Sequence, residues 1–111
     1  IVAVILINEF ADYEADRRWG KRNLLVRTGL TRGIQVYGVL VLGAASGAHI
    51  LAWLISGSFL IQAPAFLTGL LLCLMVARGD WMDHDRREWI CAGTLLLNLL
   101  ITGSWIIAFS W

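Results

Sequence analysis

Charged side chains occupy only two short stretches of this 111-residue chain, and that distribution constrains its fold more than any motif does. All nine Lys and Arg residues and all eight Asp and Glu residues fall between Glu9 and Arg32 or between Arg78 and Glu88. The rest of the chain is apolar, so that 59% of all residues are hydrophobic and the mean hydropathy is +0.72. These values are typical of an integral membrane protein and exclude an ordinary soluble domain.

The long uncharged segments predict an all-α fold, a multi-pass transmembrane helix bundle. Residues 33–57 and 89–111 are long enough to cross the hydrocarbon core of a bilayer, which takes about 20 residues, and residues 60–77 lie at the short end of that range. Ile1 to Ile7 is too short to span, and the chain has no initiator Met. We therefore expect residues 1–111 to be a single membrane domain fragment: the end of one transmembrane helix, an aspartate-rich loop and three further transmembrane helices.

Local signals set the expected boundaries of the helices. The first helix should end near Asp16, and Thr31 is the expected N-cap of a helix over residues 33–56. Pro64 suits the first turn of the next helix, where its missing N–H would be unpaired in any case. Gly79 is expected to help end that helix.

The distribution of charge also predicts a topology. Two helices joined by a short turn at residues 57–62 return the chain to the side it left, so the loops at 9–32 and 78–88 should share one face. That face carries every Lys and Arg, and the positive-inside rule makes it cytoplasmic. The expected location is a cell membrane, with the charged loops in the cytoplasm; the family resemblance described below implies the inner membrane of a prokaryote.

A column of polar side chains follows the apolar run at the start of the chain. Asn8, Asp12 and Asp16 recur at every fourth position, and residues four apart lie on one face of a helix. Magnesium in proteins is usually held by one or two carboxylates together with phosphate oxygens of a substrate. Lys21 and Arg22 follow closely and could neutralise the remaining phosphate charge. The pattern predicts a metal-bridged phosphate site. A solvated loop of mixed charge after a transmembrane helix would have the same sequence pattern and is the alternative.

The second polar loop, between the third and fourth predicted helices, is expected to have a structural role. Asp83, His84 and Asp85 are adjacent in sequence, and neighbours on a helix or strand do not converge on one ion. Asp85 and Glu88 instead resemble a capping pair that opens a helix over residues 88–109.

Two smaller patterns are assigned to packing. Gly43 and Gly47 form a GxxxG pattern, which is typical of close contact between membrane helices. Cys73 and Cys91 have no metal-ligand spacing and lie in apolar segments, so we expect them to be buried packing residues.

The stretch from Asn8 to Gly29 resembles the second aspartate-rich motif of the UbiA superfamily of intramembrane prenyltransferases, and it covers about a fifth of the chain. It looks most like the branch that prenylates 1,4-dihydroxy-2-naphthoate in menaquinone biosynthesis. The family fold is a bundle of nine transmembrane helices with two aspartate-rich motifs at one cavity. Ala11 departs from the proline that relatives often carry. The other motif is absent from these residues, so the fragment alone should be inactive.

The resemblance implies a role for each residue of the polar column. Asp12 and Asp16 would hold a magnesium ion on a prenyl diphosphate and are the catalytic candidates, with Asn8 assisting on the same face. Lys21 and Arg22 would bind the diphosphate. The implied cofactor is Mg²⁺, and the expected partners are a polyprenyl diphosphate, an aromatic acceptor and the lipid bilayer, with no nucleic acid.

The expected function is therefore Mg-dependent transfer of a polyprenyl group to an aromatic acceptor, and dihydroxynaphthoate is the preferred acceptor. Within the same class, 4-hydroxybenzoate or another aromatic is the alternative. A rival from a different class is a non-enzymatic membrane subunit or a piece of a transporter. In that rival, the charged loops would serve only topology and assembly.

Overall fold

The computed structural model describes residues 1–56 and 60–109. All the regular secondary structure in these two ranges is helical. No strand occurs within those two ranges, in agreement with the all-α prediction. The elements in chain order are α1 (Val2–Arg18), α2 (Leu24–Thr28), α3 (Leu30–Ser56), the short 3-10 helix η1 (Leu60–Gln62), α4 (Ala63–Ala77), the 3-10 helix η2 (Asp80–Met82) and α5 (His84–Phe109).

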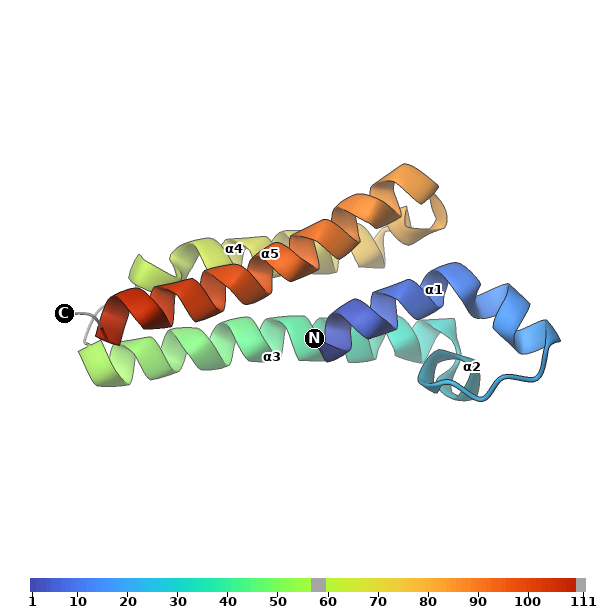
Figure 1. Ribbon diagram of the computed structural model, residues 1–111, viewed down its shortest axis with the longest axis horizontal. Helices are drawn as coiled ribbons and strands as arrows, with labels where there is room; N and C mark the ends of the chain where they lie inside the picture. Colours follow the sequence, from blue (N-terminus) through green and yellow to red (C-terminus); the bar gives the residue numbers. More distant parts are fainter. Residues whose placement is uncertain (57–59, 110–111) are drawn as a thin grey trace.

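The helices lie side by side along one axis, and both charged loops lie at the same end of the bundle. In Figure 1, α3 and α5 run along its length, α4 lies behind α5, and α1 covers the half nearest α2. The segment from α1 to α3 and the connection between α4 and α5 meet at that end, where α1 contacts η2. Residues 9–32 and 78–88 thus lie at one end of the bundle, as predicted, and the side of the membrane that they face stays a prediction. Residues 57–59 of the predicted turn lie outside the described ranges.

Two helices are long and apolar enough to cross a membrane. They are α3, from Leu30 to Ile55, and α5, from His84 to Ile107. Only 22% of the most apolar window of each is buried within the chain, whereas a core helix of a soluble protein is mostly buried. The 15 residues of α4 fall below the roughly 20 that a span requires. Of the three membrane-spanning helices that were predicted, only α3 and α5 are long enough to span. The multi-pass arrangement stays a prediction.

Large apolar side chains cover the outer surface of the bundle. More than half of the surface of several of them is exposed, on α3, α4 and α5 alike; examples are Val39, Leu54, Leu71, Leu95 and Leu99. Extended apolar surfaces of this kind are rare on soluble monomers and mark contact with a membrane or with other protein.

The starts of α3 and α5 differ from the predicted caps. Gly29, rather than Thr31, is the N-cap of α3, because its carbonyl accepts from the Gly33 amide at 2.9 Å. With φ at 82°, Gly29 turns the chain directly from α2 into α3 and leaves no position for a polar cap. Asp83, not the pair Asp85 and Glu88, caps α5.

The cap at Asp83 has clear geometry. Its backbone is extended and its Oδ1 accepts from the Arg86 amide at 3.1 Å, which is the usual N-cap contact. Pro64 lies in the first turn of α4, and Gly79 follows α4 in the left-handed conformation with φ at 82°, as predicted for both.

The close contact between α3 and α4 is made by Gly69, not by the predicted GxxxG. A Cβ on Gly69 would lie 3.3 Å from the Cβ of Ala45, whereas a Cβ on Gly43 or Gly47 would meet nothing within 4 Å. Within the described chain, the GxxxG prediction is therefore wrong: this face of α3 is open.

A buried hydrogen bond joins α3 to α5. The hydroxyl oxygens of Tyr37 and Thr94 lie 2.7 Å apart, and the Thr94 hydroxyl also donates to the Ile90 carbonyl at 2.7 Å. Because a threonine hydroxyl has one hydrogen, Tyr37 is the donor to Thr94. This bond fixes α3 against α5 in the interior.

Candidate functional site

The polar column lies at the last turns of α1, where the chain reverses. After Arg18, Gly20 adopts a positive φ of 69°, and the Lys21 amide donates to the Asp16 carbonyl at 2.9 Å. This reversal brings the side chains of Lys21 and Asn23 back to the end of α1. As a result, Asp16 is only 7% exposed although it lies near the end of α1, beside the polar loop.

Both carboxylate oxygens of Asp16 have partners from that returning loop. The Lys21 ammonium lies 2.7 Å from Oδ1, and the Asn23 side chain donates to Oδ2 at 2.8 Å. A buried carboxylate requires such compensation, because desolvation penalises its charge. Asp16 therefore organises the loop that follows α1.

The short helix α2 is held by two polar side chains. Asn23 is its N-cap, and its Oδ1 accepts from the Val26 amide at 2.8 Å. Glu9 of α1 accepts from the Leu25 amide at 3.2 Å. The Leu25 side chain is fully buried against Gly33, where a Cβ would overlap it. These contacts join α1, α2 and the start of α3.

Lys21 lies in the field of both aspartates. Its pKa is raised above the ordinary value of 10.5, chiefly by the hydrogen bond to Asp16 and by the charge of Asp16, and to a smaller extent by the charge of Asp12. Lys21 is therefore a cation at neutral pH. The ammonium of Lys21 thus places a positive charge directly beside the Asp16 carboxylate.

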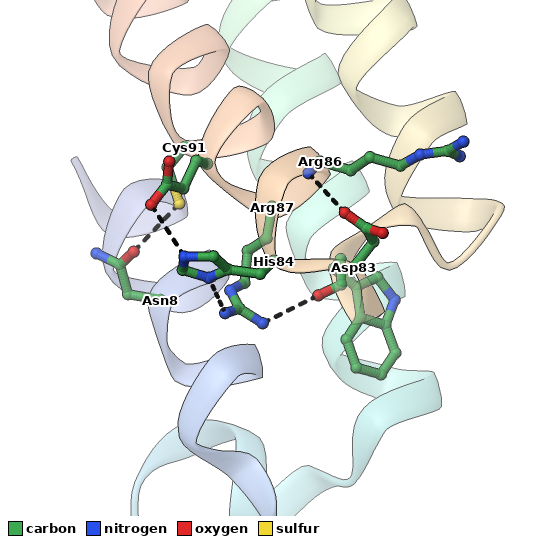
Figure 2. Close-up of polar contacts among 8 residues, drawn as sticks. Asn8, Asp83, His84, Arg86, Arg87 and Cys91 are labelled. Atoms are coloured by element: carbon green, nitrogen blue, oxygen red, sulfur yellow. Dashed lines mark hydrogen bonds and ion pairs between the residues drawn. The ribbon is translucent and has the colours of Figure 1, made fainter.

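The remaining predicted site residues are more open. Asp12 is exposed, as are Asn8 and Arg22. The side-chain oxygen of Asn8 accepts from the Cys91 thiol at 3.2 Å, a contact between α1 and α5 that Figure 2 shows. Only the amide N–H groups of Asn8 can donate to an anion, because its side-chain oxygen is an acceptor.

Two carboxylates of this column have the capacity to hold a divalent cation. Asp12 makes no hydrogen bond or ion pair with the described residues. A carboxylate offers about four lone-pair sites, of which Asp16 uses two. No group of three or more His, Cys, Asp and Glu side chains that could hold a metal occurs among the described residues. A cation held by Asp12 and Asp16 would have to take its other ligands from water or phosphate.

The second polar loop makes local contacts, in line with the structural role expected for it. Arg86 lies 2.6 Å from Asp80, and His84 lies 3.3 Å from Glu88 one turn along α5. Figure 2 shows Asp83 against the start of α5 and Arg87 against His84.

Sequence reasoning missed Asn23 and Glu9. Asn23 stands directly before the apolar run that begins at Leu24, which is a usual N-cap position and could have been recognised. Glu9 and Leu25 are 16 residues apart in the sequence, so no local sequence pattern predicts their contact.

Comparison of the chain with protein-family models, with curated proteins and with solved structures gives no match.

Proposed function

We propose that this chain is the last part of a UbiA-type prenyltransferase, which moves a polyprenyl group from its diphosphate to an aromatic acceptor at the cytoplasmic side of a cell membrane. The preferred acceptor is dihydroxynaphthoate, as in menaquinone biosynthesis. The observation that carries the proposal is the charge arrangement at the end of α1. Asp12 and Asp16 lie one turn apart on α1, and Asp16 forms an ion pair with Lys21 at 2.7 Å.

In this proposal, Asp12 and Asp16 would hold Mg²⁺, which would supply positive charge to the diphosphate. Transfer breaks the allylic C–O bond, and the electron pair leaves with the diphosphate. A ring carbon of the acceptor then forms a C–C bond to the prenyl carbon, and the ring loses one proton. Lys21 and Arg22 bind the leaving diphosphate, where negative charge develops, and Asn8 donates from its amide. The apolar helices keep water from the cation.

The rival function, a non-enzymatic membrane subunit, is favoured by one observation. Both oxygens of Asp16 already bind side chains of the same loop, as a purely structural aspartate would. The two functions differ in what Asp12 is for, because Asp12 has no such structural contact among the described residues.

The test compares Asp12→Asn and Asp16→Asn with Asp85→Asn in membranes that contain the intact protein. Asp85 is an exposed carboxylate of the second loop and serves as the matched control. With a polyprenyl diphosphate, Mg²⁺ and dihydroxynaphthoate, we expect each of the first two variants to lose activity on the order of 100-fold, the usual effect of removing one stabilising group at developing charge. Asp85→Asn should keep its activity.

Near-normal transfer by both Asp12→Asn and Asp16→Asn would refute the proposed site. Transfer only to 4-hydroxybenzoate would change the acceptor and keep the class. An intact wild-type protein that transfers to neither acceptor would favour the membrane subunit.

A further inference from the structure

A run of positive charge without a single acidic residue begins at the end of α1. Residues 17–32, the basic segment, carry six Lys and Arg side chains and no Asp or Glu. The six are Arg17, Arg18, Lys21, Arg22, Arg27 and Arg32. The loop at 78–88 differs, because its three Arg side chains stand against four Asp and Glu. The excess of positive charge is therefore confined to one segment and is not shared by both loops.

Most of the cations in the basic segment are not neutralised by the chain. Lys21 forms its ion pair with Asp16, which accounts for one of the six. The other five are arginines, and all five are exposed. None of them has a carboxylate within ion-pair distance among residues 1–56 and 60–109. This holds even for Arg17 and Arg18, which share α1 with the exposed carboxylates of Asp12 and Glu14.

Arg27 and Arg32 are the arginines with the least compensation. They lie on α2 and α3, and neither helix contains an Asp or Glu. Glu9 is the carboxylate that reaches α2, and it binds the Leu25 amide instead of an arginine. Arg32 also lies in the first turn of α3, where the positive end of the helix dipole disfavours a cation. Since no group of the described chain favours the charge of Arg32, its position indicates an external anion.

The position of the basic segment favours lipid headgroups as that anion. The end of α1, α2 and the start of α3 lie together at one end of the bundle, as Figure 1 shows. The segment runs directly into the candidate membrane span Leu30–Ile55, and headgroup phosphates are the anions at the mouth of such a span. Trp19, in the middle of the positive run, is 85% exposed. Trp side chains concentrate at the interface between membrane and water, where their apolar ring and polar N–H are both accommodated.

We propose that the basic segment binds the headgroups of anionic phospholipids, with Arg27 and Arg32 on their phosphates. Guanidinium groups bind phosphate oxygens bidentately, and an anionic headgroup supplies the negative charge that the segment lacks. The proposal does not rest on the proposed prenyl transfer, because Arg27 and Arg32 have no role there and lipid binding requires no reaction.

The test measures which lipids associate with the intact protein in phosphatidylcholine bilayers. A trace of spin-labelled phosphatidylglycerol or phosphatidylcholine reports the fraction of label that the protein immobilises. A basic side chain at the surface strengthens association with anionic lipid about fivefold. Because only lipids beside the basic segment gain, the preference averaged over all lipids in contact with the protein should be about twofold to fourfold. It should fall close to one at high salt, because the Debye length at 1 M is about 3 Å.

Three double variants separate the basic segment from the overall charge. Arg27→Gln/Arg32→Gln should lose most of the preference for phosphatidylglycerol. Arg78→Gln/Arg86→Gln removes the same charge from two exposed arginines of the other loop and should keep the preference. Arg27→Lys/Arg32→Lys retains both charges and should keep at least half of it, which distinguishes lost charge from lost structure.

Equal immobilisation of the two spin labels by the wild type at low salt would overturn the proposal. So would an equal loss of preference in Arg27→Gln/Arg32→Gln and Arg78→Gln/Arg86→Gln, because overall charge would then explain the effect. A single-stranded RNA oligomer tests the other class of polyanion. A wild-type protein that binds this oligomer but shows no lipid preference would assign the basic segment to nucleic acid and reject the lipid.

Discussion

Substitution of Asn23 should open the loop after α1 while the rest of the bundle stays intact. Asn23 donates to Asp16 and caps α2 through Val26, so Asn23→Ala removes both contacts at once. Loss of an N-cap costs about 1 kcal/mol, and loss of a hydrogen bond to a partly buried carboxylate costs about 1–2 kcal/mol. The local opening of residues 19–28 should therefore become about 2–3 kcal/mol easier.

Trypsin can measure this opening, because Lys21 and Arg22 are cleavage sites within the loop. When opening and closing are fast relative to cleavage, the cleavage rate follows the population of the open form. The expected change of about 2–3 kcal/mol then corresponds to a rate increase of roughly 30- to 150-fold at these two bonds. Mass spectrometry of the intact protein in nanodiscs identifies each cut, and Arg78 and Arg86 in the other loop provide internal controls.

A third variant separates the two contributions. Asn23→Ser keeps a capping oxygen but is too short to reach Asp16, so its cleavage rate should fall between those of the wild type and Asn23→Ala. Rates for Asn23→Ala within threefold of the wild type would contradict the role given to Asn23. An equal increase at Arg78 would show a global loss of structure instead.

Two further predictions concern charge and the interior. Lys21 is the only lysine of the chain, so an NMR titration of ¹³Cε-labelled lysine should give one resonance with a pKa above 10.5. Asp16→Asn should lower that pKa more than Asp12→Asn does. The opposite order would exclude the ion pair with Asp16 as the main cause of the raised pKa. Because the folded-state pKa is raised, the stabilisation from this ion pair should persist at all pH values below 10.5 and disappear as the pH rises through the raised value. A double-mutant cycle of Tyr37→Phe and Thr94→Val, measured by unfolding in SDS, should give a coupling energy of about 0.5–1.5 kcal/mol, and additive effects would argue against the buried hydrogen bond.

The sequence predicted the helices well, because long uncharged runs and clustered charges leave few alternatives. Pro64 and Gly79 have local conformational preferences that act alike in any context, and their positions were predicted correctly. Caps were harder to place. The second loop offers Asp80, Asp83 and Asp85 as possible caps, and the 3-10 turn that selects Asp83 depends on the packing of η2.

Within the candidate site, the sequence placed Asn8, Asp12 and Asp16 on consecutive turns of one helix, and the structure has them within α1. Their surroundings could not be predicted. Asp16 is buried only because the chain reverses at Gly20 and returns Lys21 and Asn23 to it. Asp12, one turn earlier, is out of reach of that loop's hydrogen bonds and stays exposed.

The open glycine face of α3 has a consequence for where this helix can exist. Four glycines lie within α3, at positions 33, 38, 43 and 47. In water, each glycine disfavours a helix by about 1 kcal/mol relative to alanine, and at three of the four no neighbouring side chain packs to offset that cost. In hydrocarbon the backbone has no other hydrogen-bonding partner, so the same residues must remain helical. A synthetic peptide of α3 should accordingly be largely unfolded in buffer and helical in lipid vesicles.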